Sequence, residues 1–170
     1  MTALAQWPPR TRDTRAVVET YERVLGWPLI VDDTLVSATC ASATLERNPD
    51  SMLSTTCSAF DAVTVSYSVG ADLLVLLGRH NLEPVPALTD GHDRTVVLVA
   101  ASTGAALASL TGVLVDSGPA GRLSRPPSPR WRWDTPPWNV RAQEPYPLLT
   151  AVEIEPSLST AVRSFGCLSP

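Results

Sequence analysis

Proline and tryptophan dominate the stretch from Arg122 to Arg141, RLSRPPSPRWRWDTPPWNVR. It contains five of the chain's 16 prolines, three of its five tryptophans and five of its 13 arginines, and Asp134 is its only acid. Because proline fixes φ and has no backbone N–H, the PPSP and TPPW segments are excluded from helix interiors and central strands. The stretch therefore predicts rigid, extended connections that hold arginine and tryptophan side chains in fixed directions.

The chemistry of these side chains allows two interpretations. Arginine binds phosphates and tryptophan stacks on bases, which predicts a nucleotide or nucleic-acid site. Its candidate residues are Arg122, Arg125, Arg130, Trp131, Arg132 and Trp133. Alternatively, the stretch closes one edge of the core, and the arginine stems pack on the indole rings. In that case Trp131 and Trp133, at alternate positions, both point inward, and the arginines between them are surface residues.

The size and charge of the chain predict one domain that attracts nucleic acid only locally. A chain of 170 residues suits a single domain, 1–170, with a sizeable core. Its net charge is −4, so the molecule as a whole repels nucleic acid. Any binding of that kind requires a local basic patch.

Cysteine usage and hydropathy predict a cytoplasmic protein that does not enter a membrane. The three cysteines, Cys40, Cys57 and Cys167, are scattered without CxxC spacing, which favours reduced thiols over a disulfide framework. Pro8 and Pro9 interrupt the N-terminal segment, which therefore does not resemble a signal peptide. No uncharged run of about 18 apolar residues is present either.

The first half of the chain predicts two helices separated by short strands. Apolar residues recur at helical spacing before Gly26, and β-branched residues mark the strands. Residues 32–58 carry a weak signal, in which 36–45 is expected as a strand or an irregular segment. The expected elements are a helix at 11–25, strands at 27–31 and 59–67, and a helix at 71–79.

The second half predicts a β-hairpin around the Asp90–Gly91 turn pair. The apolar run that begins at Thr95 is typical of a central strand covered on both faces. The expected elements are strands at 84–88 and 95–101, a helix at 104–116, a short strand at Leu123, an edge strand at 148–154 and a helix at 157–165. Together these elements predict a two-layer α+β fold, with helices packed on a mixed or antiparallel central sheet.

The order of these motifs resembles the bifunctional DNA primase/polymerase N-terminal domain, a branch of the archaeo-eukaryotic primase superfamily. The motifs are Gly26-Trp27-Pro28 between a helix and a strand, Phe60–Val65 followed by Gly70 and a leucine helix, Thr89-Asp90-Gly91 leading into Thr95–Val99 and a further helix, and Pro126-Pro127-Ser128 followed by Trp133. They cover roughly residues 16–150, and 151–170 form a C-terminal helix and tail. The chain is most similar to the short, stand-alone actinobacterial versions.

The resemblance implies a nucleotidyltransferase that uses divalent metal, with an Asp-x-Asp pair on the first central strand and a histidine on the hairpin strand that meets the nucleotide phosphates. This chain departs from that pattern. Asp61 stands alone, with Val63 two residues later, and Thr95 lies near the expected histidine. His92 comes two to three residues early, in the turn. The catalytic set implied by the resemblance is therefore not intact.

Isolated acids and a histidine remain as weaker candidates. Asp61 and His92 are the catalytic candidates, and Asp61, Asp90 and Asp93 are the candidate ligands for Mg²⁺ or Mn²⁺. A single carboxylate seldom suffices for such a cation, so Asp61 is expected to cap the following loop or to be exposed. His92 is expected to be a solvated loop residue. No cofactor is expected unless the catalytic hypothesis holds.

Three functional hypotheses follow. The first is a primase/polymerase-like domain that has lost catalysis and binds nucleotide or single-stranded nucleic acid as a regulatory module. The second is an active nucleotidyltransferase that uses Mg²⁺ or Mn²⁺. The third is a protein-interaction domain whose contact surface is the proline- and tryptophan-rich stretch.

Overall fold

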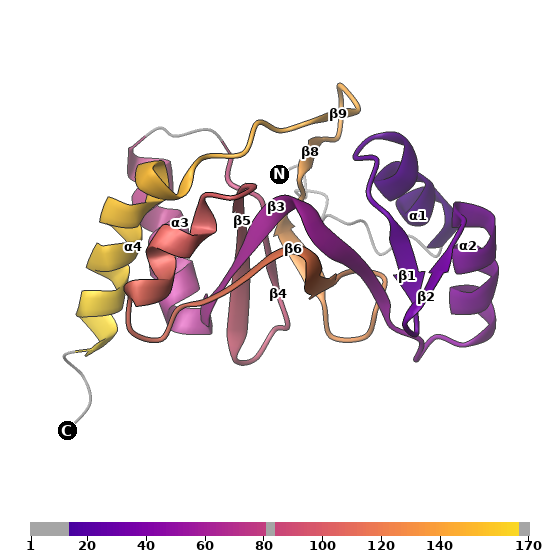
Figure 1. Ribbon diagram of the computed structural model, residues 1–170, viewed down its shortest axis with the longest axis horizontal. Helices are drawn as coiled ribbons and strands as arrows, with labels where there is room; N and C mark the ends of the chain where they lie inside the picture. The colour runs from indigo at the N-terminus through magenta and orange to yellow at the C-terminus, as the bar shows by residue number, and fades with distance from the viewer. Residues whose placement is uncertain (1–13, 81–83, 167–170) are drawn as a thin grey trace, which may run out of the picture.

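The computed structural model describes residues 14–80 and 84–166 and has the α+β architecture expected from the sequence. Helices lie at both ends of the molecule, with α3 and α4 at one end and α1 and α2 at the other, and the sheet runs between them (Figure 1). The elements are α1 Thr14–Arg23, β1 Leu29–Val31, β2 Thr34–Val36, α2 Ala38–Arg47, β3 Leu53–Ser66, α3 Tyr67–Arg79, β4 Ala87–Thr89, β5 Arg94–Ala100, the 3-10 helix η1 Gly104–Ser109, β6 Leu114–Ser124, β7 Arg132–Thr135, β8 Trp138–Asn139, β9 Glu144–Pro145 and α4 Ala151–Gly166.

The 14-residue strand β3 organises the sheet. The strand order is β2-β1-β3-β5-β4-β7, and β6 also pairs with β3; every one of these pairings is antiparallel. Ser54 pairs with both Ile30 and Ser124, whereas Ala62 pairs with both Leu98 and Asp116. Therefore β1 and β5 share one edge of β3 at its two ends, and β6 follows the other edge.

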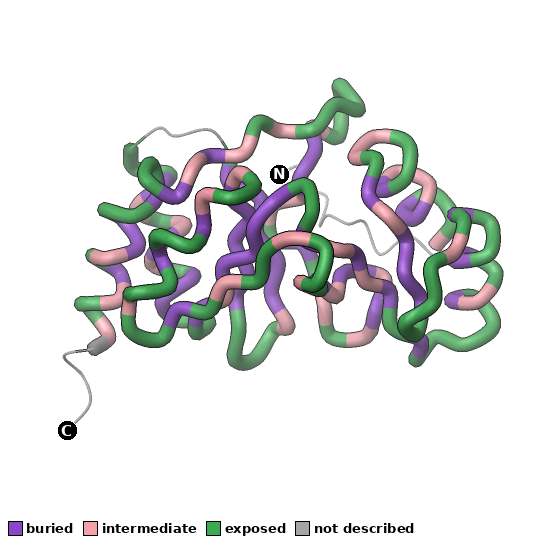
Figure 2. Tube along the Cα trace, viewed as in Figure 1, coloured by how far each residue is buried: buried purple, intermediate pink, exposed green. Residues whose placement is uncertain are grey.

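Both faces of the central strands are buried, as the apolar run in β5 predicted (Figure 2). Val96 and Leu98 face a cluster that contains α1, α2 and most of the aromatic residues, which we call the aromatic core. Val97 and Val99 face a second cluster formed with α3, α4 and η1, which we call the helical core. This alternation follows from the two-residue period of a strand.

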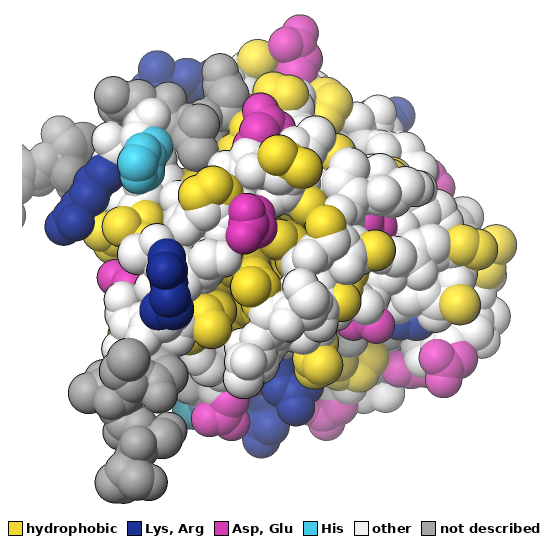
Figure 3. All heavy atoms as spheres, turned by 60° about the vertical axis from the view of Figure 1, so that its left-hand side comes forward, with side chains coloured by type: hydrophobic (Ala, Val, Ile, Leu, Met, Phe, Trp, Pro, Cys, Tyr) yellow, Lys and Arg dark blue, Asp and Glu magenta, His cyan; other side chains and the backbone are white. Residues whose placement is uncertain are grey.

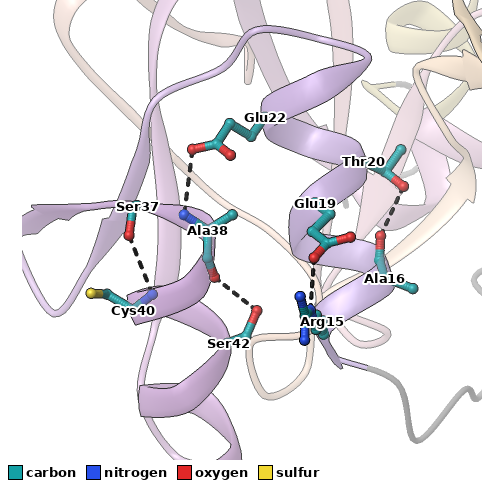
Figure 4. Close-up of polar contacts among 9 residues, drawn as sticks. All are labelled: Arg15, Ala16, Glu19, Thr20, Glu22, Ser37, Ala38, Cys40 and Ser42. Carbon is teal, nitrogen blue, oxygen red and sulfur yellow. Dashed lines mark hydrogen bonds and ion pairs between the residues drawn. The ribbon is translucent and has the colours of Figure 1, made fainter.

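Helix α2 packs against α1 and occupies a region where the sequence predicted a strand or an irregular segment at 36–45. That prediction is wrong. The Ser37 side chain caps the helix by accepting a hydrogen bond from the Cys40 N–H (3.4 Å), and Glu22 of α1 accepts one from the Ala38 N–H (3.3 Å; Figure 4). Because a contact from another helix supplies part of this cap, local spacing alone gave only a weak helix signal.

The predicted helix at 104–116 is also wrong. Only the six-residue η1 forms there, and the chain then enters β6. Leucines at helical spacing produced the error, although Leu114 is 66 % exposed on the strand. Gly118 has φ +68° and lies at an irregularity of the β3–β6 ladder, so its turn tendency bends a strand rather than ending a helix.

At the C-terminus, the expected edge strand at 148–154 is replaced by the first turns of α4. The Glu153 carboxylate accepts hydrogen bonds from the Thr150 N–H (2.7 Å) and hydroxyl (2.8 Å), which is the glutamate half of a capping box. Pro156 lies inside the helix, which begins at Ala151 rather than at the expected Ser157. The expected helix at 157–165 is present as the remainder of α4.

The remaining expected elements are present with different bounds. The helices expected at 11–25 and 71–79 are α1 and α3, the strand expected at 27–31 is β1, and the strands expected at 84–88 and 95–101 form the β4–β5 hairpin. The strand expected at 59–67 is the second half of β3, which begins at Leu53 in the segment that carried a weak signal, and the short strand expected at Leu123 is the end of β6. Within the described residues, no helix is long and apolar enough to cross a membrane. Cys167 lies outside the described residues, as do Pro8 and Pro9.

Candidate functional site

The structure separates the six arginine and tryptophan candidates instead of gathering them on one surface. Arg125 and Trp133 are buried, with 0 % and 2 % exposure. Trp131 is half-buried against the aromatic core. The exposed candidates are Arg122, Arg130 and Arg132. The arrangement resembles the core-closing interpretation, in which tryptophans point inward and the neighbouring arginines point outward.

Arg125 is enclosed by aromatic rings and backbone carbonyls. Its Cζ lies 4.0 Å from the centroid of the Tyr21 ring and 5.5 Å from that of Trp27. Nη2 donates to the carbonyls of Pro28 (3.2 Å) and Ser54 (3.5 Å), whereas Nε and Nη1 have no hydrogen-bond partner. Burial lowers the pKa of this guanidinium to about 10, although its interaction with Tyr21 opposes the shift. Arg125 is thus inaccessible to a ligand in solvent.

Trp133 belongs to the same buried group. Its Nε1 donates to the Tyr21 hydroxyl at 2.7 Å, and its ring meets Trp138 edge to face, with 6.4 Å between centroids. Burial raises the pKa of Tyr21 to about 12. Trp133 is therefore a core residue with a satisfied donor and is not placed to stack on a base.

Asp61 is buried and is used within the fold. Its Oδ2 accepts a hydrogen bond from the Gly104 N–H at 2.7 Å, at the start of η1. A Cβ atom at Gly104 would lie 2.8 Å from the Asp61 Cβ, so the glycine permits this close approach. The sequence had placed this cap on the loop between β3 and α3 or left Asp61 exposed, whereas Asp61 is buried and accepts its hydrogen bond at the start of η1.

The Asp90 side chain stabilises the hairpin turn by accepting hydrogen bonds from its backbone. Its Oδ1 accepts hydrogen bonds from the N–H groups of His92, Asp93 and Arg94, each at 3.0 Å. Slight burial opposes ionisation, but these hydrogen bonds and the nearby His92 charge lower the pKa of the Asp90 carboxyl. His92 and Asp93 are exposed. The turn is therefore stabilised by its own acid, as Asp-Gly turns commonly are.

The three candidate metal ligands do not share one location. Asp61 pairs with Val99 in the ladder, whereas the hairpin turn adjoins Arg94, five residues away along β5. At about 3.3 Å per residue this separation is roughly 16 Å. Among the described residues, no group of three or more metal-binding side chains is close enough to hold an ion.

One small pocket does include a predicted residue. It has a volume of about 70 Å³ and lies where α3 begins, beside the β4–β5 hairpin and β7. Arg132 and Asp134 of β7 both line the pocket, and Asp134 has no partner in β4 because the β4–β7 ladder is irregular there. Neither side chain makes a hydrogen bond or ion pair with another described residue. The lining residues are Tyr67, Ala71, Leu74, Thr89, Thr95, Arg132 and Asp134.

Close packing between α3 and β5 positions the inner wall of this pocket. A Cβ atom at Gly70 would lie only 2.3 Å from the Thr95 Cβ, so the glycine brings the helix down onto the strand. The Thr89 hydroxyl donates to the Arg94 carbonyl (3.0 Å) and accepts from the Gly91 N–H (3.0 Å). Tyr67 is 44 % exposed.

Another hollow is a broad groove of about 550 Å³ beside Trp27, Pro28 and Leu35. Its two side chains with charged or hydroxyl groups are Glu22 and Ser37, and both already cap α2. The end of the molecule that carries α4 has apolar and acidic side chains at its surface, and its arginines lie apart from one another (Figure 3). Neither region presents the convergent free polar groups found in the smaller pocket.

Comparison with known proteins adds no relative from which a function can be transferred. No protein-family model matches the chain, and no curated protein or solved structure matches it. The geometry of the pocket and the sequence motifs are therefore the observations that bear on function.

Proposed function

We propose that this protein is a catalytically degenerate domain of the primase/polymerase type that binds a nucleotide, or the end of a single strand, at the pocket beside α3. One observation carries the proposal. The pocket brings Thr95, near which the resemblance implies a phosphate-binding histidine, together with Arg132, from the stretch that follows Pro126-Pro127-Ser128. Two motifs distant in sequence thus meet at a single hollow.

The residues of the pocket suit an anionic group. The Arg132 guanidinium provides a cation with several N–H donors, and phosphate is a group it binds well. Thr95 and Tyr67 add hydroxyl donors, while Asp134 accepts hydrogen bonds from sugar hydroxyls or base amino groups.

The volume of the pocket limits how a nucleotide fits. About 70 Å³ accommodates a phosphate group but not a whole nucleotide, because pockets that enclose such ligands span about 300 to 1,000 Å³. The sugar and base therefore lie outside the pocket. The exposed ring of Tyr67 offers a surface on which a base stacks.

Titration with a nucleoside triphosphate and with a short single strand, followed by tryptophan fluorescence at low and high salt, tests the proposal. We expect Arg132→Ala to weaken binding about tenfold or more, because a charge-assisted contact to phosphate contributes about 1.5–3 kcal/mol. The matched control is Arg130→Ala, since Arg130 is exposed in the same stretch but does not line the pocket. High salt is expected to weaken binding in both the wild type and the control.

The outcomes separate the three hypotheses. Equal binding by Arg132→Ala and the control would contradict the proposed site. A requirement for Mn²⁺ would favour the active nucleotidyltransferase instead. Absence of binding under all conditions would favour a protein-interaction domain.

A further inference from the structure

Strand β7 lies at one end of the seven-stranded sheet. Its four residues, Arg132–Thr135, pair with β4 on one side. On its other side it has no strand partner among the described residues. A free edge exposes backbone N–H and C=O groups that can pair with another strand.

The charges along this edge are self-complementary. Arg132 and Asp134 are exposed and both line the pocket, while Trp133 between them points into the aromatic core. Asp134 is the extra residue at an irregularity of the β4–β7 ladder, in which Leu88 pairs with Trp133 and Ala87 pairs with Thr135. In an antiparallel pair centred on Trp133, Arg132 of one chain lies opposite Asp134 of the other, and Asp134 lies opposite Arg132. Opposite charges at directly facing positions stabilise a strand pair. A two-fold axis through Trp133 therefore forms both ion pairs at once.

We propose that two copies of this chain associate through antiparallel pairing of β7 with β7 of the second copy. The self-complementary charge pattern identifies the partner, because a two-fold contact requires the same surface on both sides. In this register three residues of each β7 pair, because Thr135 would face Trp131, which lies outside the strand. Pro136 and Pro137 follow the strand directly and end the pairing. Such a short contact predicts a weak, concentration-dependent dimer with a single register.

The dimer places the two pockets on a shared face. Each pocket lies on the side of β7 that carries Arg132 and Asp134. Five strand spacings of about 4.8 Å separate β5 from β5 of the second copy, roughly 24 Å in all. Strands β4 and β7 of both chains then form the sheet surface between the two α3 helices. This inference does not require nucleotide binding, because it rests on the strand edge and its charges.

Sedimentation equilibrium over micromolar to millimolar concentrations, without nucleotide, tests the dimer and its register. We expect Arg132→Asp and Asp134→Arg each to weaken dimerisation about tenfold or more, because each variant places like charges opposite one another. An equimolar mixture of the two variants is expected to form a heterodimer, since it restores opposite charges at both positions. The double variant, Arg132→Asp with Asp134→Arg, is expected to dimerise like the wild type.

Two results would overturn the inference. One is a wild-type protein that stays monomeric at all these concentrations, in which case the edge charges prevent strand pairing. The other is a dimer that neither single variant weakens, which would indicate a different interface. Arg130→Asp serves as the control for a change of net charge in the same stretch. Because association is measured without nucleotide, failure here is distinguished from failure of nucleotide binding, although Arg132 takes part in both.

Discussion

Arg125 is a buried cation that has no ion pair with an acid among the described residues. Burying a charge without a counter-charge is costly. Here the Tyr21 ring, two carbonyls and the Trp27 ring offset part of that cost. The long aliphatic stem of arginine also fills space in the aromatic core.

Two substitutions at Arg125 separate its charge from its packing. We expect Arg125→Met to keep the free energy of unfolding within about 1 kcal/mol of the wild type, because it retains a long stem and removes a buried charge. Arg125→Ala is expected to lose about 3 kcal/mol, because it leaves a cavity. Urea denaturation measures both. An equally large loss in the methionine variant would mean that the guanidinium itself stabilises the fold.

The buried thiol of Cys57 is expected to make the free energy of unfolding depend on pH. Burial, followed by the charges of Asp116 and Asp61, raises the pKa of its thiol from 9.0 to about 12, and Arg122 only partly opposes this. Because the folded state favours the neutral thiol, its stabilising contribution is complete below pH 9 and is lost as the pH rises through about 12.

The test compares the wild type with Cys57→Ala. The urea midpoint of the wild type is expected to fall between neutral pH and this alkaline range, and the fall is expected to be smaller in the variant. Tyr21 titrates in the same range, with a pKa near 12, but it is present in both proteins. Parallel pH profiles would show that Cys57 ionises equally easily in the folded and unfolded states.

At the scale of elements, α3 contains two glycines with opposite roles. A Cβ atom at Gly70 would lie 2.3 Å from the Thr95 Cβ, whereas nothing lies within 4 Å of one at Gly78. We expect Gly70→Ala to destabilise the protein by about 2 kcal/mol or more through overpacking. Gly78→Ala is expected to stabilise it by about 0.5 kcal/mol through helix propensity. Thermal unfolding of both variants checks the prediction, and equal effects would contradict the close packing of α3 on β5.

The helices also show where local sequence patterns were sufficient to predict an element and where they were not. Leucines at helical spacing predicted α3 correctly because that spacing matched a buried face against β5. Similar spacing at 104–116 failed because tertiary pairing with β3 drew 114–124 into a strand. The start of α4 was missed because residues 148–154 were expected to form an edge strand, although the Glu153 carboxylate accepts a hydrogen bond from the Thr150 N–H at the start of the helix.

For the whole molecule, the order of helix and strand patterns in the sequence predicted the α+β class, but it did not predict the pocket. Arg132 was a sequence candidate, whereas Tyr67, Thr89 and Asp134 were not singled out as ligands. They meet only because β7 pairs with β4, although more than 40 residues separate the two strands in the chain. Strand order of this kind is set by long-range packing, on which local patterns carry little information.

Because the net charge is −4, the place where a nucleotide binds tests the proposed site as directly as the affinity does. A molecule with this charge repels a polyanion except where a cation is exposed beside free donors. The central claim is that the pocket containing Arg132 is such a place.

Backbone amide chemical shifts during titration with a nucleoside triphosphate test this claim most directly. We expect the largest shifts at Tyr67, Thr89, Thr95 and Asp134, and we expect Arg132→Ala to remove them while Arg130→Ala does not. Shifts confined to other surfaces, or shifts that persist in Arg132→Ala, would contradict it.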